Sequence, residues 1–255
     1  MVFGLFKRWR REKWLAEPFP PQWSGWLAAM PFYQRLSADE QARLRNIITV
    51  LVHEKNWEGC DGLTATDEMK VTIAAQAGLL LLNLEDHDYF RRAATVLIYP
   101  STFVNPSPRY GPGGVVSEGQ ANLGEAWYAG PVILAWDAAR HGVVNHVDGH
   151  NLVLHEFAHK LDMDDHVADG TPPLDSNQQY RRWTEVMTEH YERLVSDAER
   201  GRATLLDTYG ATNPAEFFAV ATECFFEKPR QMRERHAELY ALLRDYYKQD
   251  PAERI

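Results

Sequence analysis

Residues 155–159 read His155-Glu156-Phe157-Ala158-His159, an H-E-x-x-H motif, and the residues on either side predict that it lies in a helix. Two histidines four residues apart on a helix face the same side, so both imidazoles can bind one metal ion. The glutamate beside the first histidine can then reach a water molecule on that metal and act as a general base. Because a five-residue pattern also arises by chance, the interpretation depends on the rest of the chain.

The composition is that of an acidic protein with enough apolar residues for a large core. The chain has 255 residues, of which 45% are hydrophobic and 12% aromatic, and a formal net charge of -9 at pH 7. Nucleic-acid binders are usually basic, so we expect no direct nucleic-acid partner. The two cysteines, Cys60 and Cys224, form no C-x-x-C pair and favour a reducing compartment, the cytoplasm.

The sequence has the pattern of neither a secretory signal nor a membrane span. A secretory signal places positive charge before an apolar core, whereas here Phe3 and Phe6 precede most of the basic residues. The longest apolar run, residues 79–82, is far too short to cross a bilayer. We therefore expect a soluble protein without a membrane partner.

Residues 1–35 form a basic and aromatic N-terminal segment. Its four prolines are Pro18, Pro20, Pro21 and Pro31. They prevent one continuous helix there. The amphipathic start of the segment suits contact with a membrane surface. The alternative that we prefer is a segment that packs Trp14 and Phe19 onto the body of the domain.

Capping residues followed by apolar positions at helical spacing predict most of the helices. Ser37 and Glu40 form a capping box before a helix to about residue 55, and a second helix begins after Thr66. Asn151 caps the motif helix, and Ser176 caps a long helix to about residue 200. Further helices are expected from residue 214 and over about residues 230–248. The small residues at 73–78 indicate a closely packed core helix.

Two runs of β-forming residues, 95–99 and 132–136, predict strands, and the prolines and glycines of residues 100–130 predict loops and short hairpins. The fold class is therefore α+β, mostly helical with a small mixed β-sheet. No linker divides the chain, so we expect a single domain over residues 1–255, with residues 1–35 packed on it.

A catalytic metal site needs a third protein ligand beside His155 and His159, and a carboxylate is a common choice. Glu216 is the best candidate, because it lies in the first turn of a helix about sixty residues downstream. An equally good explanation from spacing alone is that Glu216 completes a capping box with Asn213. The weaker alternatives for the third ligand are Glu223 and Glu185.

The segment from His155, HEFAHKLD, resembles the zinc helix of the MtfA (Mlc titration factor A) peptidase family, which is related to the catalytic domain of anthrax lethal factor. The block YGATNPAEFFA at residues 209–219 is also similar to that family, as are residues 67–69 and 130–132 with the segments that follow them. The similarity extends over roughly residues 20–245. It implies a zincin-like metallopeptidase with one Zn²⁺ per chain.

The resemblance also implies a role for each site residue. His155, His159 and Glu216 would bind zinc, and Glu156 would pass a proton from water to the leaving amine. Tyr209 would donate a hydrogen bond to the oxyanion. The chemistry is consistent, since a zinc ion activates water and a second donor stabilises the developing charge.

Other residues near the motif have weaker assignments. Asp162 follows His159 by three residues, and we interpret it as a hydrogen-bond partner of a zinc-bound histidine or as a partner of the helix end or the next loop. We interpret His141, His146 and His150 as ordinary loop histidines. The strand at residues 132–136 either holds an extended peptide at its edge or is a plain core strand.

The sequence thus supports a zinc-dependent, aminopeptidase-like peptidase that acts on peptide substrates. The resemblance also implies binding to the Mlc transcriptional repressor, and hence regulation of glucose phosphotransferase-system genes. The alternative is a non-catalytic protein that sequesters the repressor and retains a zinc site. A purely structural zinc would normally have four Cys or His ligands. Two imidazoles and a carboxylate also suit iron, but Glu156 favours hydrolytic zinc.

Overall fold

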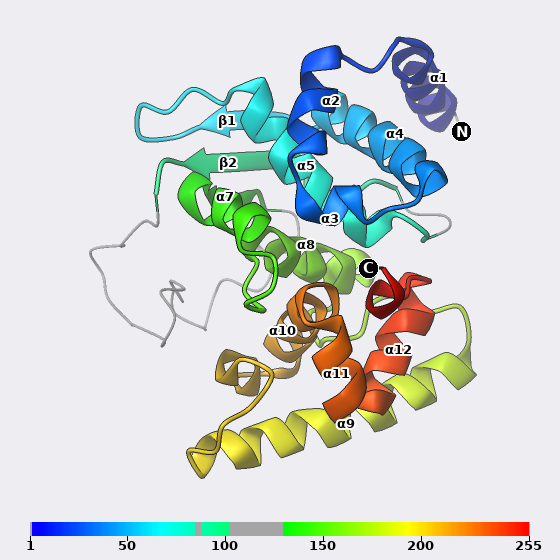
Figure 1. Ribbon diagram of the computed structural model, residues 1–255. Helices are drawn as coiled ribbons and strands as arrows, with labels where there is room; N and C mark the ends of the chain where they lie inside the picture. Colours follow the sequence, from blue (N-terminus) through cyan, green and yellow to red (C-terminus); the bar gives the residue numbers. More distant parts are fainter. Residues whose placement is uncertain (1, 85–87, 102–129, 255) are drawn as a thin grey trace.

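The computed structural model describes residues 2–84, 88–101 and 130–254, and helices dominate these parts of the chain (Figure 1). Helix α8, Leu152–Asp162, crosses the middle of the molecule. The N-terminal helices and the β-sheet lie on one side of it and the C-terminal helices on the other. The motif lies in this helix, as the sequence predicts. Nearly all of the predicted loop region, residues 100–130, falls outside the described residues.

The N-terminal segment consists of three separate helices. They are α1 (Val2–Ala16), α2 (Pro21–Ala28) and α3 (Pro31–Gln34). The prediction that prolines interrupt this segment is confirmed, since Pro21 and Pro31 each begin a new helix. Trp14 stacks on His53 with the ring centroids 5.2 Å apart, as expected for a segment that packs onto the body. Trp23 is buried, so α2 also contributes to the core.

The sheet has three strands in the order β1-β2-β3, and both pairs are parallel. The strands are β1 (Asn56–Gly59), β2 (Thr95–Tyr99) and β3 (Val132–Ala135). The prediction of a mixed sheet is wrong for these described strands. Helix α5, Asp67–Leu81, connects β1 to β2, and a helical crossover returns the chain in the same direction. Strand β1 is absent from the prediction because its four residues bury no side chain fully.

Helices α4 (Ala38–Glu54) and α5 pack against each other in the N-terminal half. Their caps are the predicted ones, Ser37 with Glu40 for α4 and Thr66 for α5. Gly78 permits the close approach, because a Cβ at this position would lie 2.9 Å from Leu44 Cδ1. The small residues of α5 therefore serve the core, as the sequence predicts.

The remaining helices follow the sheet. They are α7 (Trp136–Val144), α9 (Asn177–Glu199), α10 (Pro214–Glu227), α11 (Pro229–Arg235) and α12 (Ala237–Tyr247), with short 3-10 turns η1 (Met163–Asp165), η2 (Thr208–Ala211) and η3 (Pro251–Glu253). The prediction of one helix over residues 230–248 is wrong, because the non-helical backbone of His236 divides it. Along the described chain, every helix is too short or too polar to cross a membrane.

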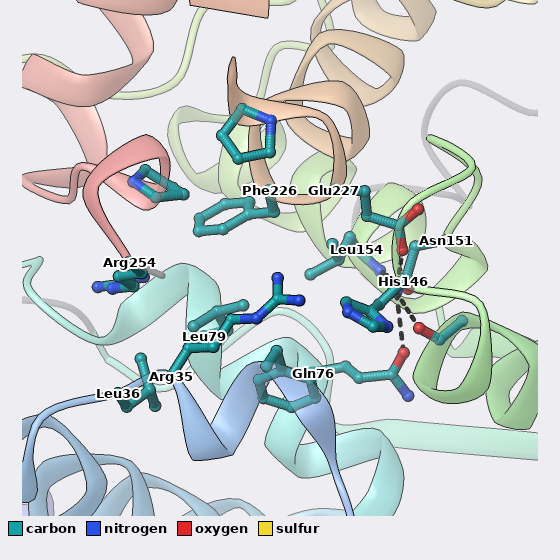
Figure 2. A pocket seen from close by; sticks show the side chains of 14 residues that line it. Arg35, Leu36, Gln76, Leu79, His146, Asn151, Leu154, Phe226, Glu227 and Arg254 are labelled. Atoms are coloured by element: carbon teal, nitrogen blue, oxygen red, sulfur yellow. Dashed lines mark hydrogen bonds between the residues drawn. The ribbon is translucent and has the colours of Figure 1, made fainter. Parts of the chain in front are cut away.

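A buried polar network joins α5, α8 and α10 (Figure 2). Asn151 caps α8, since its side-chain oxygen accepts a hydrogen bond from the backbone of Leu154 at 3.0 Å. The amide of Asn151 donates to Gln76 of α5 and to Glu227 of α10, each at 3.0 Å. Its backbone N–H donates to Glu223, also of α10. One residue thus fixes the start of the motif helix against two neighbours.

The contact at Gly78 gives a test of the fold. We expect Gly78→Val to lower the free energy of unfolding by about 1–3 kcal/mol, because the added methyl groups would overlap Leu44 and Ile47. Gly25→Ala in α2 is the matched control, since no atom lies within 4 Å of the added Cβ. Urea denaturation of both variants measures the difference. A Gly78→Val protein as stable as the wild type would contradict this packing.

Candidate metal centre

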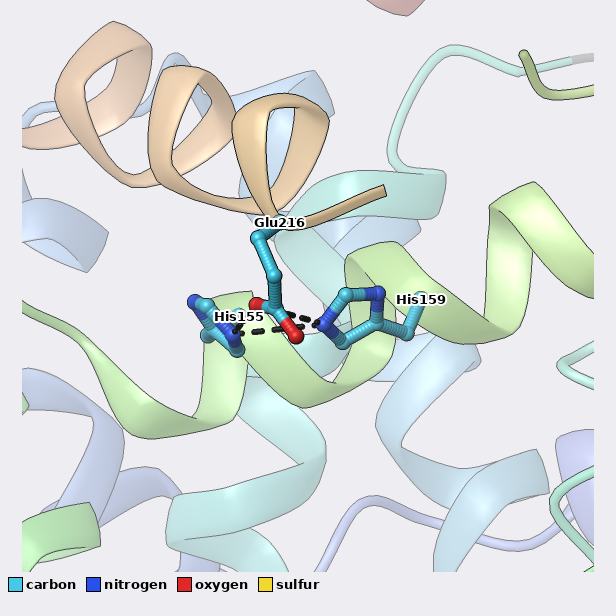
Figure 3. Close-up of side chains that lie close together, drawn as sticks. All are labelled: His155, His159 and Glu216. Atoms are coloured by element: carbon cyan, nitrogen blue, oxygen red, sulfur yellow. Dashed lines mark hydrogen bonds and ion pairs between the residues drawn. The ribbon is translucent and has the colours of Figure 1, made fainter. Parts of the chain in front are cut away.

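The two motif histidines lie side by side on one face of α8. Their Nε2 atoms are 3.2 Å apart, and their ring centroids are 4.9 Å apart (Figure 3). Both side chains are buried, with exposed fractions of 9% and 11% for His155 and His159. The helical spacing therefore brings two imidazole nitrogens to one point, as predicted from the motif.

Glu216 reaches the same point from α10. Its Oε2 atom lies 3.0 Å from Nε2 of His155 and 3.3 Å from Nε2 of His159 (Figure 3). Its backbone N–H is bound by the side chain of Asn213, which caps α10 at 2.9 Å. The cap therefore orients the first turn of α10, and the carboxylate of Glu216 is free to face the histidines.

These three side chains offer a suitable donor set for a metal ion. One ligand atom from each of His155, His159 and Glu216 lies within 4.8 Å of the other two. Two imidazoles and one carboxylate leave a coordination position for water or substrate, as in catalytic metal sites of proteins. Two imidazole nitrogens and one carboxylate oxygen form a donor set that suits a divalent transition metal, and the imidazoles would be neutral when they bind it.

The charges within the cluster stabilise one another. Burial opposes the charged form of His155, but hydrogen bonds to Glu216 and Glu223 raise its pKa well above the usual value. Burial likewise acts to raise the pKa of Glu216, but hydrogen bonds with His155 and His159 lower that pKa far below its ordinary range. The carboxylate of Glu216 is therefore ionised at neutral pH and ready to bind a cation.

Glu223 holds the other nitrogen of His155. Its Oε1 accepts a hydrogen bond from Nδ1 of His155 at 2.8 Å, and its Oε2 accepts from the backbone of Asn151. A carboxylate behind a metal-binding imidazole fixes the ring and makes it a stronger ligand. The sequence suggests Glu223 only as an alternative third ligand. Glu185, the other alternative, is exposed on α9 and lies outside the cluster.

Asp162 is buried, and within the described residues its hydrogen bonds do not go to a histidine. Its two oxygens accept hydrogen bonds from the backbone N–H groups of Gly170 and Thr171 at 3.0 and 2.8 Å. Burial raises the pKa of Asp162 to about 6, against these hydrogen bonds. Of the two interpretations from sequence, the loop partner is the one that the geometry favours. Nδ1 of His159 has no hydrogen-bond partner within the described parts of the chain.

Tyr209 lies next to the cluster on η2. Its ring centroid is 6.0 Å from that of His155. Burial and then the neighbouring carboxylate of Glu216, to which its hydroxyl is hydrogen-bonded, raise the pKa of Tyr209. The phenol therefore stays protonated and keeps a hydrogen to donate.

Glu156 is half-buried on the same helix, and Lys160 follows one turn later. The Nζ atom of Lys160 donates to the carbonyl of Gly130, just before β3, at 3.2 Å. Burial lowers the pKa of Lys160, and the charge of Glu156 partly opposes this effect. The sequence analysis does not identify Lys160, although a lysine within a buried stretch of the motif helix is a usable signal.

The three histidines predicted to lie in loops stay outside the metal cluster, but the prediction of a loop is wrong for His141, which lies in helix α7. His141 pairs with Asp148 at 3.1 Å, and His150 pairs with Asp207 at 3.3 Å. His146 lines a separate cavity.

Comparison with known proteins agrees with this arrangement. A family model described as glucose-regulated metallo-peptidase M90 matches residues 6–248. The uncharacterized protein slr2042 of Synechocystis sp. is 40% identical over 246 residues, which cover 95% of this chain and 89% of that protein. Mlc titration factor A of Serratia proteamaculans is 33% identical over 92% of this chain and 89% of its own length. The protein of the same name from Yersinia pestis is 31% identical over a match that covers 95% of this chain and 92% of that protein.

The family match spans almost the whole chain, and it includes both segments that supply the metal cluster. The chain therefore belongs to the Mlc titration factor A family of glucose-regulated M90 metallo-peptidases.

Proposed function

We propose that this protein is a zinc-dependent, zincin-like peptidase with aminopeptidase-type activity on short peptides, built as a single domain. The observation that carries the proposal is the convergence of His155, His159 and Glu216 beside Glu156 on the motif helix. Two free cysteines are typical of a reducing compartment, and we propose a cytoplasmic location.

In this proposal, His155, His159 and Glu216 hold the zinc ion. A zinc ion bound there lowers the pKa of water and polarises the carbonyl of the scissile peptide bond. Glu156 takes a proton from the attacking water and gives it to the leaving amine. Tyr209 donates a hydrogen bond from its hydroxyl group to the developing oxyanion. Glu223 keeps the ring of His155 in place.

Strand β3 is a candidate for holding the substrate. It is at the edge of the described sheet, and it packs against α8. Ile133 of this strand is 49% exposed. An extended peptide could add to this edge by main-chain hydrogen bonds, with its scissile bond directed toward the motif helix.

A second candidate function is binding of an Mlc-type repressor, with an effect on glucose phosphotransferase-system genes. The support is the name Mlc titration factor A, which two of the relatives share. Repressor binding without catalysis is the alternative. The presence of metal ligands, base and oxyanion donor in one place favours a retained activity, since sequestration alone requires none of these groups.

Glu156→Gln separates the two functions. We expect this variant to bind one zinc ion as tightly as the wild type, but to lose about 10²–10⁴-fold in kcat/KM, because the general base is gone. The measurements are zinc content and hydrolysis of a panel of aminoacyl and short internal-peptide substrates. If the zinc-loaded wild type cleaves nothing, even with the repressor added, the peptidase proposal is wrong and the binding function replaces it.

Tyr209→Phe tests the oxyanion donor. We expect kcat to fall by about 10²–10³-fold with little change in KM, because the hydrogen bond forms mainly in the transition state. Tyr191→Phe is the matched control, since the Tyr191 hydroxyl donates to the carbonyl of Ala211 next to the same 3-10 turn. Equal rates for Tyr209→Phe and the control would remove Tyr209 from the mechanism.

Glu223→Gln tests the support of His155. We expect zinc affinity to fall by about 10–100-fold, because the imidazole loses its carboxylate partner. Asp162→Asn should leave the affinity unchanged, because Asp162 binds only backbone N–H groups of the next loop. Competition with a chromogenic chelator measures the zinc dissociation constants of both variants. The reverse order of effects would restore Asp162 as the partner of a zinc-bound histidine.

A further inference from the structure

A cavity of about 50 Å³ lies against the N-terminal end of α8 (Figure 2), and it is separate from the metal cluster. Leu154 and Asn151 contribute to its wall, and none of the three cluster residues does. A water molecule needs about 10–15 Å³ of such space, so the cavity has room for a small organic molecule. Its walls come from the N-terminal helices, α5, α10 and the C-terminal end of the chain.

Much of the wall is apolar. Phe32, Leu36, Leu79, Leu154 and Phe226 line it. Four of these side chains come from helices α3, α5, α8 and α10, and Leu36 comes from the connection between α3 and α4. A short alkyl group would be favoured there, since burying it removes apolar surface from water.

One positive charge is available to a ligand. Arg35 is an exposed residue at the rim of the cavity, its guanidinium points into the cavity (Figure 2), and no described residue forms an ion pair with it. The other arginine of the wall, Arg254, already binds Glu40 and donates to Gln249. A planar guanidinium without a partner matches the two oxygens of a carboxylate.

His146 adds an unsatisfied polar group. Both of its ring nitrogens are buried, and the backbone of Val144 is the one hydrogen-bonding group that acts on the ring, so at least one nitrogen has no partner among the described residues. Burial and then the charge of Arg35 lower the pKa of His146, so the ring is neutral and carries one N–H donor. Buried polar atoms are nearly always hydrogen-bonded, so such a group requires a ligand or a water molecule.

The acidic group in the wall does not oppose an anion. Both oxygens of Glu227 are hydrogen-bonded, one by the backbone of Gly149 at 2.9 Å and one by the amide of Asn151 at 3.0 Å. Burial raises the pKa of Glu227 to about 8, so at neutral pH this group is mostly uncharged. Among the described residues, the guanidinium of Arg35 is therefore the one unbalanced charge of the wall, and it suits a ligand with one negative charge rather than two.

From this geometry we propose that the cavity is a binding site for a short-chain monocarboxylate, with its carboxylate on Arg35 and His146 and its alkyl chain against Leu79 and Phe226. The site is separate from the proposed peptidase centre, and its occupancy does not depend on catalysis. It is nevertheless close to that centre, because Asn151 of its wall binds Glu223, which binds His155.

Titration of the zinc-loaded, ¹⁵N-labelled protein with butyrate tests the proposal, with amide NMR signals as the readout. We expect saturable shifts at Leu36, Gly142 and His146. Butyramide, which has the same shape without the charge, and inorganic phosphate should give none. If butyramide binds equally well or phosphate binds more tightly, the proposal is wrong. Shifts confined to Glu156 and its neighbours would mean that butyrate binds the metal, and would also overturn it.

Arg35→Gln should weaken butyrate binding at least about tenfold, because a charge-assisted hydrogen bond is lost. Arg181→Gln, at an exposed position on α9, is the matched control and should bind as the wild type does. If Arg35→Gln is not folded, Arg35→Lys replaces it, with intermediate affinity expected because the charge remains and the planar fork is lost. Unchanged affinity in a folded Arg35 variant overturns the proposal.

Discussion

The structure depends on the packing of α8 against α10. His155 lies between two carboxylates of α10, with Glu216 at its Nε2 and Glu223 at its Nδ1. The two acids are seven residues apart, about two helical turns, so they lie on the same face of α10. A buried imidazole between two buried carboxylates is stable only while all three remain together, because an unpaired charge in the interior is costly. The separation of the two helices is thereby tightly restricted.

The same pair of helices is joined by hydrogen bonds of Asn151, one turn before His155. Asn151 accepts from Leu154 and donates to Glu227 and Gln76, and its backbone binds Glu223. Every one of these contacts holds the N-terminal end of α8. The three residues of the candidate metal cluster therefore rest on a second layer of buried polar groups, whose satisfied hydrogen bonds keep these side chains in position. The cavity beside α8 borders the same layer, since Gln76, Asn151 and Glu227 line it.

Local signals in the sequence predict much of this arrangement. Caps at Ser37, Asn151 and Asn213 define helix starts because the side chain of each accepts a hydrogen bond from the first turn of its own helix. The histidine pair follows from helical periodicity alone. The pairing of Glu223 with His155 does not follow from the sequence, because spacing along α8 cannot show which distant acid faces the second nitrogen of the ring. Asp162 is close in sequence, but its oxygens bind the next loop.

The sheet and the last helices also contain features that local sequence patterns do not predict. The parallel direction of β1 and β2 follows from the crossover through α5, and the residue pattern of a single strand carries no information about that crossover. Strand β1 is short and incompletely buried, so its residues carry little β-signal. The break at His236 has no proline or glycine at the site, and its ring lies near His190, with the two Nδ1 atoms 3.4 Å apart. Each missed feature depends on contacts between segments that are distant in the chain.

The distance in sequence between α8 and α10 has a consequence for synthesis on the ribosome. Domains form from the N-terminus as the chain emerges, and α8 leaves the ribosome well before Glu216 and Glu223. Until α10 follows, His155 and Asn151 lack most of their partners. In the proposed metal site, uptake of the ion would therefore be a late step that reports completion of the fold, since a ribosome-bound chain that stops short of α10 has only two of the three cluster residues.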